Sequence, residues 1–111
     1  TLQTITAAAS TSDGLVSVAV VVPTGETRDV HVVASASYLG SGGASALNLY
    51  IGDGTTDNAV ISADASATVR GTPSTSYAVR VSTTTTFTIR FDCATNNALV
   101  KTQTISALAM R

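Results

Sequence analysis

The sequence has little charge. Only 12% of its 111 residues are Asp, Glu, Lys or Arg, against about a quarter in an average globular domain. The formal net charge is −1, and the six basic residues are spread along the chain. A surface that binds nucleic acid or an anionic membrane needs clustered basic residues. The composition therefore predicts neither nucleic acid nor a membrane as a partner.

Cysteine and long apolar runs are equally scarce. The one cysteine, Cys93, cannot form an internal disulfide, which excludes a disulfide-stapled secreted mini-domain. No stretch approaches the roughly 18 uninterrupted apolar residues of a transmembrane helix. The segment TLQTITAAAS at 1–10 lacks the basic and apolar parts of a secretion signal. We expect either a complete small protein or the tip of a longer one.

The residues that catalysis needs are few. His31 is the sole histidine, so a nucleophilic triad would have to combine it with a hydroxyl or thiol and an acid. No serine lies in the sharp-turn pattern G-x-S-x-G, and no second cysteine or clustered histidine gives Cys93 a zinc partner. We therefore expect His31 at a surface or subunit contact, Cys93 in the core, and no catalytic residue, metal or cofactor. The chain is predicted not to be an enzyme.

What the chain has instead is alternation of apolar and polar residues. The clearest case runs from Leu15 to Tyr38, LVSVAVVVPTGETRDVHVVASASY. Alternate side chains of a strand point to one face, so each half presents an apolar row to a core. Pro23 and Gly25 suit a turn, because proline has a fixed φ and glycine tolerates a positive one. The sequence therefore predicts a hairpin with inward rows at Val16, Val18, Val20 and Val22, then Val30, Val32, Ala34, Ala36 and Tyr38.

Further short strands follow, with turn signals every 8 to 12 residues or so. Ser12-Asp13-Gly14, 83–86 and Asn96-Asn97 are the predicted turns. No window shows the apolar repeat of a helix. The pattern predicts an all-β fold, a two-sheet antiparallel sandwich or jelly roll of about eight strands. We expect a strand or arm at 1–10 and one β-sandwich domain at 11–111, with strands near 44–51, 59–62, 66–70, 76–81, 87–93 and 99–110. The strand at 44–51 places Leu47, Leu49 and Ile51 on one face. The strand at 87–93 has an inward row of Phe87, Ile89, Phe91 and Cys93, with Thr88, Arg90 and Asp92 on its outer face.

Two polar loops and one tyrosine are the candidate ligand-binding positions. The segment GDGTTDN at 52–58 carries Asp53, Asp57 and Asn58, and the glycine-rich loop at 40–43 carries Ser41. Oxygens of this kind bind Ca²⁺, but the spacing is not that of a calcium loop, and an Asx-stabilised turn is the alternative. Tyr50, on the outer face of its strand, offers the aromatic platform of a sugar site.

Arg80 and Arg90 are candidate subunit contacts. If the reversal at 83–86 keeps the flanking apolar rows on one face, the two arginines lie opposite or diagonal on the outer face, where like charges repel. Asp29 or Asp92 would neutralise them within the subunit. A neighbouring subunit's carboxylate would do so equally well, because arginine suits interfaces. Both alternatives remain open from the sequence.

The last strand has apolar residues on both faces. Ile105 lies on one face and Leu108 on the other. This pattern is typical of a central strand in a layered structure, or of a strand covered by another chain. Ile105 is therefore a third candidate subunit contact.

The order of these pieces carries a resemblance. VVPTGETRDVHVVASASY, a GSGG loop, LNLYIGD, FTIRFDCAT and a closing TISALAMR resemble small β-sandwich domains at the C-terminal ends of bacteriophage tail fibres and related virion proteins. Those domains are similar to the trimeric C1q/tumour-necrosis-factor-like jelly roll. The resemblance implies a homotrimer that is assembled in the bacterial cytoplasm and located on the virion. It also implies host-surface recognition or a structural role, and a lone reduced cysteine agrees with cytoplasmic assembly.

Two non-enzymatic functions are therefore predicted. The first is a receptor-binding tail-fibre head that attaches to a host-surface glycan or protein through its loops. The second is a capsid decoration or cement protein that stabilises other virion proteins without a ligand. An enzymatic role is the least favoured, because the required residue constellations are missing.

Overall fold

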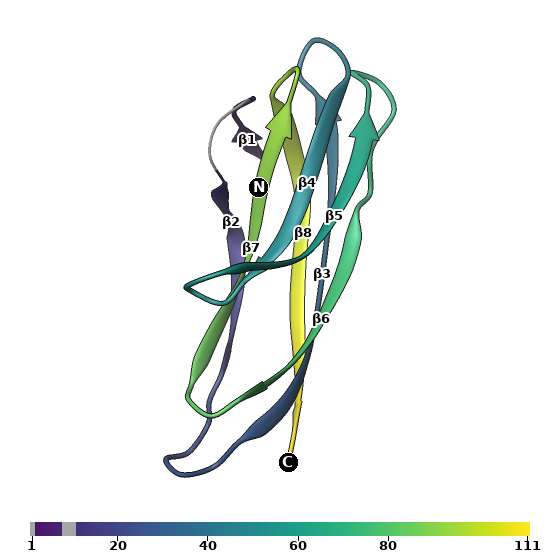
Figure 1. The fold of residues 1–111 in the computed structure, drawn as a ribbon. Helices are drawn as coiled ribbons and strands as arrows, with labels where there is room; N and C mark the ends of the chain where they lie inside the picture. The colour runs from purple at the N-terminus through teal and green to yellow at the C-terminus, as the bar shows by residue number, and fades with distance from the viewer. Residues whose placement is uncertain (1, 8–10) are drawn as a thin grey trace.

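The computed structural model describes residues 2–7 and 11–111 and places eight strands in two facing sheets (Figure 1). The predicted all-β sandwich is confirmed. No helix in these ranges is long and apolar enough to cross a membrane. The strands are β1 (Gln3–Ile5), β2 (Ser12–Val20), β3 (Arg28–Gly40), β4 (Ser45–Gly52), β5 (Asp57–Ala65), β6 (Ser74–Val81), β7 (Thr85–Ala94) and β8 (Ala98–Met110).

Strands from the first half of the chain pair with strands from the second half in both sheets. Sheet A has the order β1-β8-β3-β6, and sheet B has the order β2-β7-β4-β5. Each pairing described is antiparallel, and the pairs β1·β8, β2·β7, β3·β6 and β4·β5 join the two halves of the chain. Two Greek-key connections of this kind across two sheets define a jelly roll. The N-terminal part of the predicted arm contains β1, while Thr1 and residues 8–10 lie outside the described residues.

The predicted hairpin at Leu15–Tyr38 is wrong in its pairing. Its turn forms, because Glu26 N donates to Pro23 O at 3.0 Å and Gly25 has a φ of +82°. The turn nevertheless leads from β2 in sheet B to β3 in sheet A. The alternating pattern cannot separate these cases, because both strands bury their apolar rows in one core whether they share a sheet or face each other.

The same correction applies to two other predicted reversals. The connection after Val81 leads from β6 in sheet A to β7 in sheet B, and the Asn96-Asn97 turn leads from β7 back to β8 in sheet A. Among the described strands, only β4 and β5 are both consecutive and paired. Two smaller predictions are also wrong: Ser12-Asp13-Gly14 lies inside β2, and 66–70 forms no strand.

The core consists of the predicted apolar rows. Leu47, Leu49 and Ile51 of β4 are fully buried, and Phe87, Ile89 and Phe91 of β7 lie beside them in sheet B. Sheet A supplies the row of β3, and Cys93 is buried as expected. The buried members of the β3 row are Val30, Val32, Ala34, Ala36 and Tyr38.

Strand β8 is central, and a bulge explains its apolar residues on both faces. It lies between β1 and β3, and its register with β3 shifts between the pairs Ser37–Thr102 and Tyr38–Val100. One extra residue reverses which alternate side chains face inward. Val100 is therefore buried before the bulge, and Ile105 packs against the core after it. Leu108 then lies on the outer face with 60% of its surface exposed.

Tyr38 ties the two sheets together. Its ring lies in the core, and its hydroxyl crosses to sheet B, where it shares its proton between Ser45 O at 2.9 Å and Ala63 O at 2.6 Å. Any side chain at Gly71 would collide with the ring. Burial raises the pKa of Tyr38 to about 12, because the phenolate would lose its hydration.

We expect Tyr38→Phe to lower the free energy of unfolding by about 1–2 kcal/mol, since two buried carbonyl oxygens lose their donor. The raised pKa of Tyr38 means that the folded state favours the neutral phenol. The contribution of the neutral Tyr38 phenol to the free energy of unfolding is complete below its ordinary pKa of 10.0, and it declines as the pH rises toward 12. Denaturant unfolding across alkaline pH should therefore show a smaller loss of stability in Tyr38→Phe than in the original protein. Equal losses would contradict this role.

Candidate functional site

The outer face of sheet B carries a cluster of polar side chains. The register places Asn48 of β4 opposite Asp92 of β7, and Tyr50 opposite Arg90. On the far side of β7, Arg90 is opposite Asp13 of β2. Because directly opposed residues of an antiparallel pair share a face, these side chains form neighbouring rows across the sheet.

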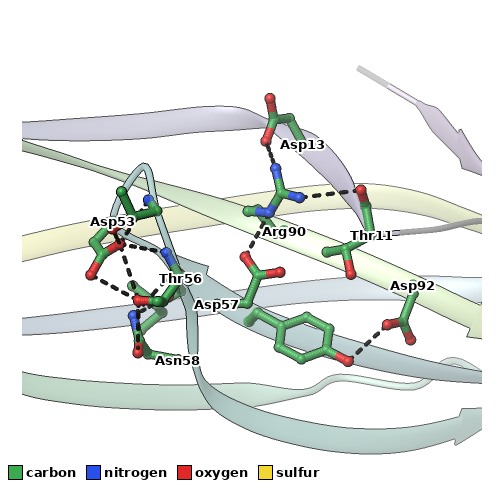
Figure 2. A network of polar contacts seen from close by, with 11 residues as sticks. Thr11, Asp13, Asp53, Thr56, Asp57, Asn58, Arg90 and Asp92 are labelled. Carbon is green, nitrogen blue, oxygen red and sulfur yellow. Dashed lines mark hydrogen bonds and ion pairs between the residues drawn. The ribbon is translucent and has the colours of Figure 1, made fainter.

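One row is a continuous chain of hydrogen bonds. Ser62 Oγ donates to Asn48 Oδ1 at 2.5 Å, and Asn48 Nδ2 donates to Asp92 Oδ1 at 2.7 Å. The Tyr50 hydroxyl donates to Asp92 Oδ2 at 2.7 Å (Figure 2). Burial raises the pKa of Tyr50 to about 12, and its bond to the Asp92 carboxylate adds to that rise. Both oxygens of Asp92 are thus occupied by neutral donors.

Arg90 is the centre of the second row. Its Nη1 donates to Asp13 Oδ1, and its Nη2 donates to Thr11 O at 3.2 Å. Its Nε lies 2.7 Å from Asp57 Oδ1. This contact is an ion pair without a hydrogen bond, since the N–H does not point at the oxygen. Figure 2 shows the guanidinium between the two carboxylates. The side chain of Arg90 is 28% exposed, so one half-buried cation joins β2, β7 and the start of β5.

The loop between β4 and β5 is held by its own aspartate. Asp53 Oδ1 accepts from the backbone N–H of Thr55 at 3.0 Å and of Thr56 at 2.9 Å, and both hydroxyls also donate to it. These bonds hold the pKa of Asp53 well below its usual range. The arrangement is the Asx-type turn that the sequence offered as the alternative to calcium. Residues 2–7 and 11–111 contain no group of three or more His, Cys, Asp or Glu side chains arranged to hold a metal.

A polar cavity of about 310 Å³ lies beside Arg90. Its lining offers two carboxylates, one guanidinium and three hydroxyls. Gly52 leaves the room that Arg90 occupies, since a Cβ there would lie 2.5 Å from Arg90 Cδ. Carboxylates, a guanidinium and hydroxyls together suit a polar ligand that both donates and accepts hydrogen bonds. The lining residues are Asp13, Gly52, Gly54, Thr55, Thr56, Asp57, Thr88 and Arg90.

The structure brings only some of the candidate ligand residues together. Asp57 lines the cavity, and Tyr50 lies beside Arg90 on the same face. Asp53 shapes the loop, and the amide of Asn58 donates to Ile51 O at 3.3 Å. Ser41 lies away from this site, beside the turn before β8, where its N–H donates to Asn97 O.

The candidate subunit contacts lie in three different places. The premise that Arg80 and Arg90 face each other is wrong, because β6 and β7 belong to different sheets. Asp29 pairs with Arg80 through Nε to Oδ1 at 2.8 Å and Nη2 to Oδ2 at 3.0 Å, which keeps the pKa of Asp29 below its usual value. Ile105 packs against the core, while Arg90 belongs to the cavity.

Neither His31 nor Cys93 faces this site. His31 is on the outer face of sheet A, directly between Ala78 and Leu108 in the strand register. Cys93 is buried, and its Sγ donates to Ile5 O at 3.2 Å. Burial raises the pKa of the Cys93 thiol, so the reactive thiolate is disfavoured.

Asp13 and Thr88 were not among the sequence candidates, and Gly52 was included only as the first residue of the candidate loop at 52–58. Asp13 was assigned to a turn, and Thr88 to an ordinary outer position. Their convergence depends on β7 lying between β2 and β4, which no local pattern encodes. One available signal was the glycine at the end of the 44–51 alternation, since a strand glycine often marks a close approach of another group.

No family model, curated protein or solved structure matches this chain.

We expect Arg90→Ala to lower the free energy of unfolding by about 1–2 kcal/mol, because charge-assisted bonds to Asp13 and Thr11 and the ion pair with Asp57 are lost together. Arg80→Ala is the matched control. The ion pair of Arg80 with Asp29 is exposed, so the loss of the Arg80 side chain should produce no measurable change in urea unfolding. Equal losses in the two variants would show that the Arg90 network does not stabilise the sheet.

Proposed function

We propose that this chain is a non-enzymatic attachment head of a bacteriophage tail fibre, which binds the host surface as a homotrimer. The observation that carries the proposal is the polar cavity on the outer face of sheet B, at Asp13, Asp57 and Arg90. The jelly-roll order supports a virion role only by analogy of fold. The virion, assembled in the host cytoplasm, is the proposed location.

The arrangement of charged groups supports binding in preference to catalysis. Cleavage of a glycosidic bond uses two carboxyl groups that are free to take and give protons on either side of that bond. Here Asp13 and Asp57 both contact the Arg90 guanidinium, which lies between the two carboxylates where a bond to be cleaved would have to lie. The histidine and the thiol lie elsewhere, on the outer face of sheet A and in the core.

The outer face of sheet A supports self-association. Near the end of β8 it exposes Val33 at 40%, Leu108 at 60% and Met110 at 53% of their surfaces. His31 and the short side chain of Ala78 continue the same area, which we call the C-terminal patch. A second subunit that covers these side chains removes their apolar surface from water, which favours association. We therefore assign the trimer contact to this patch, and no longer to Ile105.

A capsid decoration or cement protein is the second candidate. The observation that favours it is the edge of β8: β1 pairs only with 98–100, while β3 pairs with the whole strand on its other side. An incompletely paired edge can accept a strand from a neighbouring virion protein. This function needs no ligand in the cavity.

The oligomeric state tests the C-terminal patch. Native mass spectrometry should give a trimer, and Leu108→Glu should shift the protein to monomer, because three carboxylates would be buried in an apolar contact. The Val69→Glu variant is the control. It should stay trimeric, since Val69 is 67% exposed and lies in the loop before β6. A monomer in the original protein would contradict the proposed assembly.

Attachment itself is tested on cells. The labelled trimer should bind saturably to some members of a panel of bacterial strains, and binding should fall after removal of the surface polysaccharide. Arg90→Ala should reduce this binding at least tenfold, while Arg70→Ala should not, because Arg70 is exposed in the loop before β6 and lies outside both the cavity and the C-terminal patch. A stable trimer that binds no strain would overturn the attachment function and favour decoration.

A further inference from the structure

We propose that the cavity beside Arg90 binds one neutral pyranose unit of a surface polysaccharide, through Asp13, Asp57, Arg90 and the Thr88 hydroxyl. The biological setting of this inference rests on the proposed attachment function. The site itself rests on the charges, hydrogen-bonding groups and size of the cavity.

The charges select a neutral ligand. Two carboxylates and one guanidinium give the lining a net charge of −1 (−2 from Asp13 and Asp57, +1 from Arg90). A phosphate or an acidic sugar would approach two carboxylates and find the single cation already paired. A divalent cation would meet the guanidinium, which contacts one oxygen of each aspartate. A neutral polyol avoids both penalties, because its hydroxyls donate to carboxylates and accept from a guanidinium.

The remaining hydrogen-bonding capacity matches a sugar ring. Asp13 and Asp57 each use Oδ1 toward Arg90, which leaves Oδ2 of each as an acceptor. Each guanidinium Nη carries two N–H groups, and Arg90 uses one at Nη1 for Asp13 and one at Nη2 for Thr11 O. The Thr88 hydroxyl has no hydrogen-bond partner among residues 2–7 and 11–111. Adjacent ring hydroxyls, each a donor and an acceptor, can satisfy these groups together.

The size of the cavity limits the ligand to about one ring. Its 310 Å³ lies at the lower end of ligand pockets, which span about 300–1,000 Å³. Two glycines contribute to this space. The absence of a side chain at Gly52 leaves room for Arg90, and Gly54, with a φ of +99°, has open space where a Cβ would be. Tyr50 lies opposite Arg90, and its hydrogen bond to Asp92 leads to the neighbouring row of Asp92 and Asn48 on the same face. A longer saccharide would extend along this row.

The test is a binding titration of the full chain with methyl glycosides of glucose, galactose, mannose and N-acetylglucosamine. Glucuronic acid, N-acetylneuraminic acid and Ca²⁺ serve as charged probes. At least one neutral glycoside should bind with a dissociation constant of about 1 mM or better, as expected for a small site that forms few contacts. The charged probes should bind at least tenfold more weakly.

Variants locate the site. Asp13→Asn and Asp57→Asn should each weaken the neutral glycoside at least tenfold, while their circular dichroism and thermal unfolding remain close to those of the original protein. Asp64→Asn is the matched control, because Asp64 is an exposed aspartate on the same strand as Asp57 but outside the cavity. It should bind as the original does.

Each other outcome overturns the inference. If no neutral glycoside binds, or if a charged probe binds better, the charge argument is wrong. If Asp13→Asn and Asp57→Asn bind normally, the sugar lies elsewhere. The proposed function fails separately: a trimer that attaches to cells without any sugar affinity refutes only the ligand, and sugar binding without attachment to cells refutes only the function.

Discussion

The burial of one row of alternate side chains from each strand is the constraint on which the rest of the structure depends. The sheets face each other through rows such as Leu47, Leu49 and Ile51 on one side and Val30 and Val32 on the other. Tyr38 adds a hydrogen bond across the same interface. Once these rows are buried, only the outer faces, the strand edges and the loops remain for contact with other molecules.

The two outer faces differ in chemistry, which gives them different roles in the proposed function. Sheet B gathers charge: Asp13 and Asp57 come from its two edge strands and meet Arg90 on β7 between them. Sheet A exposes Leu108 and Met110 near the end of β8, and its Arg80 is already paired with Asp29 on the neighbouring strand. One face is therefore suited to a hydrogen-bonding ligand, and the other to a further copy of the chain. The elongated subunit, 50 × 21 × 21 Å, provides a long surface for both.

The sequence predicted the strands well and their partners poorly. Alternation located the rows of β3, β4 and β7, because a half-buried strand imposes a period of two. It did not show which strands share a sheet, since an apolar row is equally well buried against its own sheet's neighbours or across the core. A glycine in the sequence was also ambiguous, because it can mark either a turn or a close contact within a strand. Gly14 was assigned to a turn, yet it lies within β2, where any side chain would collide with Ile89 and Gln103.

The candidate site was predicted only in fragments. Tyr50 and Asp57 were named as ligand-binding candidates and Arg90 as a subunit contact. Their proximity could not be predicted, because it arises from the strand order of the jelly roll and from no local motif. The central claim is that the outer face of sheet B is the ligand-binding surface. Amide NMR spectra of the assembled protein, titrated with fragments of bacterial surface polysaccharide, test it most directly. We predict shifts concentrated at 13, 52–57 and 88–90. Shifts centred on 31–33 and 106–110, or no shifts at all, would contradict the account.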